Sequence, residues 1–92
     1  MSAYIIVELT VRDTEAKNRY STAAAPILKS FGGNFIAGGP LTMLHGDEKF
    51  ANGAIIQFDD RQKALDFYHS SDYQALLADR EVGIDSRFSL LG

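Results

Sequence analysis

The sequence predicts an α+β fold in which strands and helices follow one another in the order βαββαβ. Three observations predict it. Apolar and polar residues alternate near both ends of the chain, two longer stretches repeat apolar residues at helical spacing, and glycine pairs flank a short apolar segment in the middle. Right-handed crossovers would place both helices on one face of a four-stranded antiparallel sheet, with the first and third strands in the centre.

The N-terminal part supplies the first strand and the first helix. Residues Ala3 to Val11 are rich in β-branched and aromatic side chains and predict a strand. Asp13 is expected to cap a helix from Thr14 to Phe31, whose apolar residues lie on one stripe. Pro26 lacks a backbone donor and should kink or restart this helix. Gly32 should end it.

The middle of the chain should form a second and a third strand. Asn34 to Ala37 predicts a short strand, which Leu41 to Leu44 would extend after a bend at Gly38-Gly39-Pro40. A polar loop from Gly46 to Gly53 should lead into the third strand, Ala54 to Phe58.

A second helical region and a last strand should complete the fold. Asp60 is expected to cap the second helix, and the capping-box pair Ser71 and Gln74 should start a further helical turn. Gly83 should end this region. Ile84 to Leu91 then predicts the fourth strand.

Length and composition narrow the class of protein. Ninety-two residues are expected to form a single domain, residues 1–92. Nine Lys and Arg against twelve Asp and Glu give a net charge of −3 without a basic run, so we expect no nucleic-acid partner. Cysteine is absent, which excludes thiolate metal sites and thiol nucleophiles. No apolar run approaches about 18 residues, so we expect no membrane partner and a cytoplasmic location.

Two helices can cover only one face of such a sheet. If Ile5, Val7 and Leu9 face the helices, the opposite face, called the open face below, mixes apolar and polar residues. Its members are Tyr4, Ile6, Ile36, Ile55, Glu8, Asn34, Gln57 and Arg87. Monomers seldom expose large apolar patches. We therefore expect a homodimer in which a second copy covers this face.

Several segments, taken in order, resemble a known family. They are the glycine-flanked stretch Gly32 to Gly39, the turn His45-Gly46, the run Ser70 to Gln74 and the ending Asp85-Ser86-Arg87. Together they resemble domain of unknown function family 1330, in the dimeric α+β barrel superfamily. The resemblance implies a ferredoxin-like protomer and a homodimer, and it implies no reaction. The wider superfamily includes cofactor-independent monooxygenases, haem-handling enzymes and small-ligand regulators, so the fold does not choose a function.

Three residues are candidates for catalysis. Glu8 and Arg87 should meet on the open face, because the first and fourth strands are expected to be antiparallel neighbours. Glu8 would act as a base and Arg87 would hold an anion; the alternative is a structural ion pair. His45 lies in the loop after the second strand, where it would relay a proton or, alternatively, remain a solvated loop residue.

Three further residues, Tyr4, Asn34 and Gln57, are candidates for ligand binding on the open face. No metal site is expected, because His45 and His69 lie in different segments. No cofactor is expected either. The glycine pairs follow a helix and flank a strand, whereas a nucleotide-binding loop leads from a strand into a helix.

Two functions remain open. The first is a homodimer that binds a small organic ligand between the sheet face and the partner, with or without cofactor-independent proton abstraction or oxygenation. The alternative is a non-catalytic structural or regulatory dimerisation module. A pocket of at least about 300 Å³ lined by Tyr4, Glu8 and Arg87 would favour the first. A dry interface with Glu8 paired to Arg87 would favour the second.

Overall fold

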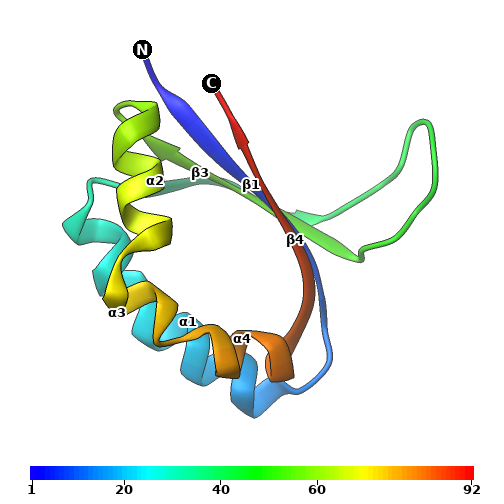
Figure 1. Ribbon diagram of the computed structural model, residues 1–92. Helices are drawn as coiled ribbons and strands as arrows, with labels where there is room; N and C mark the ends of the chain where they lie inside the picture. The colour runs from blue at the N-terminus through cyan, green and yellow to red at the C-terminus, as the bar shows by residue number, and fades with distance from the viewer.

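A curved antiparallel sheet with helices on one face makes up the computed structural model, which describes residues 1–92 (Figure 1). The elements are β1 (Ala3–Val11), α1 (Thr14–Ser30), β2 (Asn34–Pro40), β3 (Asn52–Phe58), α2 (Arg61–His69), α3 (Ser71–Gln74), α4 (Leu77–Gly83) and β4 (Ile84–Leu91). The strand order is β2-β3-β1-β4, so the first and third strands are central, as predicted. None of the helices combines the length and hydrophobicity that crossing a lipid bilayer requires.

The first helix begins and ends where the sequence indicates but is not interrupted. Asp13 caps α1, because its Oδ1 accepts from the backbone N–H of Ala16 at 2.9 Å. Gly32 follows the helix with a φ of 77°, a left-handed conformation that glycine adopts without steric cost. The predicted break at Pro26 is wrong. Pro26 and Thr22 are both exposed, so water can reach the carbonyl that loses its helical donor.

The second strand differs from the prediction. It runs through Gly38, Gly39 and Pro40, which pair with Ala54, Gly53 and Asn52 of β3, and a register shift falls between Phe35 and Ala37. Residues 41–51, called the arm below, are not a strand. Leu41 donates to the Ala51 carbonyl at 2.9 Å, and residues 42–50 make no backbone–backbone hydrogen bond. β2 therefore ends at Pro40, the last of its residues that pairs with β3, and the arm begins at the next residue.

The second helical region consists of three short helices. Asp60 caps α2 as predicted, accepting from the backbone N–H of Lys63 at 2.8 Å. Ser70 rather than Ser71 caps α3, because Ser70 has the extended backbone of a capping residue and accepts from Tyr73 at 3.1 Å. Gly83 ends α4 as predicted.

Close packing of two helices explains Gly83. A Cβ at this position would lie 2.5 Å from the backbone nitrogen of Lys17 on α1, so a larger residue would push the helices apart.

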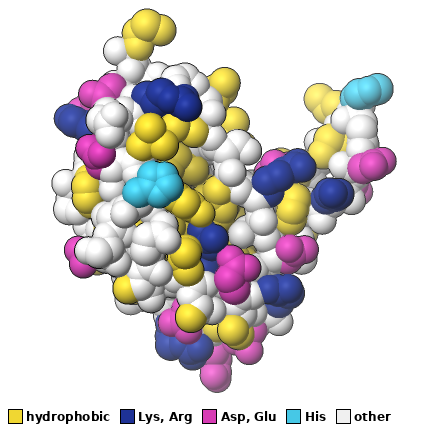
Figure 2. All heavy atoms as spheres, viewed as in Figure 1, with side chains coloured by type: hydrophobic (Ala, Val, Ile, Leu, Met, Phe, Trp, Pro, Cys, Tyr) yellow, Lys and Arg dark blue, Asp and Glu magenta, His cyan; other side chains and the backbone are white.

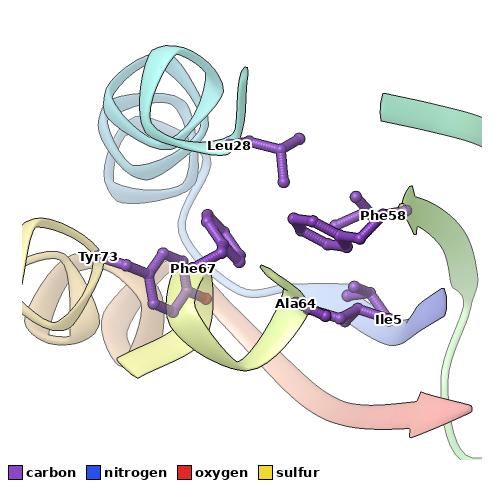
Figure 3. Close-up of a cluster of buried hydrophobic side chains, with 8 residues drawn as sticks. Ile5, Leu28, Phe58, Ala64, Phe67 and Tyr73 are labelled. Carbon is purple, nitrogen blue, oxygen red and sulfur yellow. The ribbon is translucent and has the colours of Figure 1, made fainter. Parts of the chain in front are cut away.

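The hydrophobic core lies between the sheet and the helices (Figure 3). In β1, Ala3, Ile5 and Val7 are buried against the helices, as the alternation predicts. The ring of Phe67 on α2 packs 4.7 Å from that of Tyr73 and 5.5 Å from that of Phe58, measured between centroids. The helix-facing side of the sheet is thus covered within one protomer.

Candidate functional site

The side of the sheet away from the helices carries three cross-strand rows of side chains. The strand register defines them. The first row is Leu91, Tyr4, Gln57 and Asn34; the second is Ser89, Ile6, Ile55 and Ala37; the third is Arg87, Glu8, Gly53 and Gly39. Side chains within a row contact one another directly. The open face is thus polar in its first and third rows and mostly apolar in the second.

Glu8 and Arg87 form a two-pronged ion pair, which confirms that they meet on this face. Nε and Nη2 of Arg87 donate to the two carboxylate oxygens of Glu8 at 2.9 and 3.0 Å. The Glu8 side chain is 19% exposed and that of Arg87 is 54% exposed. The hydrogen bonds from Arg87 lower the pKa of Glu8, and the same bonds raise the pKa of Arg87. A carboxylate with a lowered pKa is a weak base, so the protomer alone fits the ion-pair alternative.

Arg87 also contacts the base of the arm. Its guanidinium carbon lies 5.5 Å from the ring centroid of Phe50, a distance at which a cation is attracted to an aromatic face. Phe50 is partly buried, unlike residues 42–49 of the arm, which are exposed. The ion pair therefore lies next to the point where the arm returns to the sheet.

The three predicted ligand-binding residues lie together, apart from the ion pair. Tyr4 faces Gln57, which faces Asn34. Gln57 donates to the Ser2 hydroxyl at 3.0 Å, and Asn34 donates to the Gly32 carbonyl at 3.4 Å. Glu8 lies four positions after Tyr4 in β1, a span of about 13 Å at about 3.3 Å per residue. The apolar second row lies between the two polar groups.

His45 does not reach either group within the protomer. It lies in the arm, is exposed, and makes no hydrogen bond to the rest of the chain. The arm stands clear of the body, with hydrophobic and charged side chains along it (Figure 2). No group of three or more His, Asp and Glu side chains is arranged to hold a metal ion. The six candidates thus fall into three places: two rows of the sheet and the arm.

A hollow of about 400 Å³ opens on this face beside Glu8. Its lining includes Ile6 and Ile55 of the apolar row, and the backbone of Gly39 and Gly53. Since these two glycines face each other across β2 and β3, no side chains fill the space next to Glu8. Neither Tyr4 nor Arg87 lines the hollow. The sequence offers a signal for it, Gly53 following the glycine doublet Gly38-Gly39, but the pairing of the glycines appears only in the fold.

A second polar cluster lies among the helices and was missed from the sequence. Tyr20 and Tyr73 share a hydrogen bond of 2.6 Å between their hydroxyls. Arg80 donates to the hydroxyls of Tyr68 and Tyr73 at 2.9 and 3.2 Å, and its side chain is only 11% exposed. Its guanidinium carbon lies 4.9 Å from the ring centroid of Phe88. The nearest sequence signal is that Arg80 follows Tyr73 by two helical turns.

The surroundings of Tyr20, Tyr73 and Arg80 determine the protonation states of these side chains. Burial raises the pKa of Tyr20 and of Tyr73, so both hydroxyls stay protonated. Burial works against the charge of Arg80, but hydrogen bonds to Tyr68 and Tyr73 outweigh it, and the pKa of Arg80 is raised. The cluster is therefore a cation surrounded by neutral hydroxyls and aromatic rings.

Solved structures of other proteins share this fold. The RPA0582 protein of unknown function from Rhodopseudomonas palustris superimposes with a TM-score of 0.80 at 19% identity, over 98% of this chain and 80% of its own. A dimeric ferredoxin-like protein of unknown function from Thermobifida fusca YX gives 0.65 at 16% identity, over 100% and 91%. SnoaB, a cofactor-independent oxygenase from Streptomyces nogalater, gives 0.70 at 12% identity, over 99% and 91%.

Sequence identities this low establish the fold alone. The structural similarity confirms the predicted ferredoxin-like class. No protein of curated function matches the sequence. The model of one family, Domain of unknown function (DUF1330), matches residues 2–91, nearly the whole chain. The protein described here therefore belongs to the DUF1330 family of domains of unknown function.

Proposed function

We propose that the protein is a cytoplasmic homodimer that binds a small organic ligand between its open sheet face and the partner. The observation that carries this proposal is the hollow of about 400 Å³ beside Glu8, which lies within the size range of small-molecule sites. One side of it is open in the protomer. A second copy placed on the face would close it and give the ligand a second wall.

Three observations support the proposal that a second copy of the chain covers the open face. Ile6 and Ile55 are only partly buried, and Leu91 is 59% exposed. Glu8 and Arg87 neutralise each other, so two identical faces can approach without charge repulsion. The Thermobifida fusca protein of the same fold is described as dimeric.

The arm adds a further argument for the dimer. Figure 1 shows it projecting beyond β2 and β3 on the side of the sheet away from the helices. Leu44 is 96% exposed there. Exposing a leucine to water on a long arm does not stabilise an isolated chain. A partner lying on the open face would stand beside the arm. We therefore expect the arm of each copy to clasp the other, with Leu44 buried between them.

The ligand class follows from the two polar rows. Arg87 can exchange Glu8 for an anionic group of a ligand, because a guanidinium binds either carboxylate in the same two-pronged way. Glu8 would then lose the hydrogen bonds that lower its pKa and become a better base. A ligand that also reaches Tyr4, Gln57 and Asn34 must span about 13 Å. We propose an apolar or aromatic molecule with an anionic or enolisable end.

The catalytic form of this proposal needs no cofactor. Glu8 would abstract a proton, Arg87 would hold the resulting anion, and His45 of the arm would relay the proton. Support for this class of chemistry comes from the fold of SnoaB, which is described as a cofactor-independent oxygenase.

A second candidate function is a non-catalytic structural or regulatory dimerisation module. The ion pair favours it, because Glu8 and Arg87 already satisfy each other in the protomer. In that case the hollow would be filled by side chains of the partner.

Native mass spectrometry of the protein purified from its own host separates these candidates. The proposal predicts a dimer that carries additional small-molecule mass, and predicts that Ile55→Glu, which adds a charge to the apolar row, removes both dimer and ligand. A dimer with no added mass at any purification stage would support the dimerisation module. If a substrate is found, unchanged turnover in Glu8→Gln and Arg87→Ala would reject the catalytic assignments.

A further inference from the structure

Two adjoining cavities lie inside the protomer, between α1 and the helix-facing side of the sheet. Their volumes are about 150 and 120 Å³. Both are lined by Tyr20 and Ser21 of α1, Phe35 of β2, Ile56 of β3 and Phe88 of β4. They lie on the opposite side of the sheet from the hollow beside Glu8. A site here would thus be independent of the function proposed above.

The larger cavity has apolar walls and one polar side. The sheet contributes hydrophobic side chains, and the polar residues Lys17, Tyr20 and Ser21 all come from α1. Residues three and four positions apart lie on the same face of a helix, so the three polar side chains line one edge of the cavity. Ser21 is exposed, which places this edge at the protein surface. A ligand would therefore enter beside α1 with its apolar part toward the sheet.

Lys17 is a half-buried cation without a counter-charge. The protomer contains four ion pairs, made by Arg19, Lys63, Arg80 and Arg87, and Lys17 takes part in none. Its side chain makes no hydrogen bond either. Since an ammonium without a counter-charge attracts an anion, Lys17 makes this edge of the cavity favourable for a carboxylate.

Tyr20 brings a hydrogen-bond donor to the same edge. Arg80 donates to the Tyr73 hydroxyl, and the hydroxyls of Tyr73 and Tyr20 share one hydrogen bond. That bond uses one of the two hydroxyl protons, and the other has no acceptor in the chain. With Arg80 already donating to Tyr73, the favoured order is Arg80 to Tyr73 to Tyr20, which leaves the proton of Tyr20 free for a ligand.

We propose that the larger cavity binds a small aromatic carboxylate with a single ring. The ring would lie among Phe35, Ile56 and Phe88, and the carboxylate would accept from Tyr20 and pair with Lys17. The size fits, because an apolar cavity of about 150 Å³ takes up benzene. The charge fits because every polar group at this edge is a donor or a cation.

Benzoate is the probe, and benzamide, which has the same shape without the charge, is its neutral control. We expect benzoate to saturate the amide NMR shifts of α1 and β3 around Tyr20 and Ile56, with affinity about tenfold above that of benzamide. Lys17→Met should abolish this preference. The matched variant Lys29→Met, which changes an exposed lysine of the same helix, should retain it.

A second variant tests the location. Ser21 lines the larger cavity at its exposed edge and is not part of the hollow beside Glu8, and Ser21→Leu should narrow the cavity and weaken benzoate binding at least about tenfold. Arg87→Met on the open face should leave the benzoate affinity read from the α1 amide shifts unchanged, whereas loss of those α1 shifts in this variant would place the anion on the open face and overturn the proposal. So would the absence of saturable shifts, or equal affinity in Lys17→Met and the natural chain. Circular dichroism identifies unfolded variants, and Leu9→Phe, which lines the same cavity and not the hollow beside Glu8, replaces Ser21→Leu if that variant does not fold.

Discussion

Arg80 and Arg87 lie on opposite sides of the same sheet and are held in contrasting ways. Arg80 is 11% exposed and contacts two tyrosine hydroxyls, three aromatic rings and the carboxylate of its neighbour Glu81. Arg87 is 54% exposed and contacts one carboxylate and one aromatic ring. The first is enclosed by elements of its own chain, and the second is left partly open to water.

The contrast shows which side of the sheet is complete in one protomer. The helix-facing side has a buried aromatic core and an enclosed cation. The open face has a satisfied ion pair, an apolar row and a hollow, and none of its side chains is fully buried. Changes on the helix-facing side should therefore act on folding, and changes on the open face should act on association and ligand binding.

The largest expected effect is on folding, from Tyr73→Ala. Tyr73 is 0% exposed and packs against Phe67, Tyr68 and Tyr20, so its loss leaves a cavity and a Tyr20 hydroxyl without its hydrogen-bond partner. We expect the free energy of unfolding in urea to fall by about 3–5 kcal/mol. Tyr4→Ala on the open face is the matched control, with a much smaller loss. Equal losses at the two positions would remove the distinction between the faces.

The next effect concerns the arm. Leu44→Ser should leave the folding of each protomer intact, because Leu44 is 96% exposed there. Burial of a leucine in an interface contributes about 1.5–3 kcal/mol, so the dimer dissociation constant should rise at least about tenfold. Analytical ultracentrifugation over a dilution series measures this. An unchanged constant would show that the arm does not contact the partner.

Replacement of the two arginines tests the comparison directly. Arg80→Met removes charged hydrogen bonds to Tyr68 and Tyr73 from a nearly buried site, and should lower the free energy of unfolding by about 1.5–3 kcal/mol. Arg87→Met should lower it less, because its ion pair is exposed in the protomer. The reverse order, measured by urea unfolding at one protein concentration, would contradict the account.

The sequence predicts local features of the fold well and features set by distant contacts poorly. Alternation in β1 identifies its two faces, and the strand order brings Glu8 opposite Arg87. By contrast, Pro26 stays helical because it lies on the exposed side of α1, where water can reach the carbonyl that loses its donor, and Gly38 to Pro40 remain in β2 because they pair with β3. The helix and strand propensities of these residues predict neither outcome, because both depend on the surrounding structure.

The candidate site was predictable only in part for the same reason. The apolar row between Tyr4 and Glu8 separates the five candidates on the sheet into two groups, and the sixth, His45, lies in the arm. The Arg80 cluster depends on how α1, α2, α3 and α4 pack, and that packing joins residues more than fifty positions apart. Spacing along the chain carries no signal for it.

The smallest expected effect is a pH dependence from Glu8. Its pKa is lowered in the folded protein, so the ion pair stabilises the fold fully above the ordinary glutamate pKa of 4.5, and this contribution is lost as the pH falls through the lowered value. Glu8→Gln should therefore narrow the difference in melting temperature between pH 7 and about pH 3. Glu48→Gln, which changes an exposed arm residue outside any ion pair, is the control. An equal narrowing in the control would reject the assignment to Glu8.

The central claim is that a second copy of the chain covers the open face. Sedimentation equilibrium of the natural chain at micromolar concentration tests it most directly, with Ile55→Glu beside it. The account predicts twice the 10.1 kDa protomer mass for the natural chain and a single protomer mass for the folded variant. A natural chain that sediments at 10.1 kDa, or an Ile55→Glu variant that remains dimeric, would contradict it.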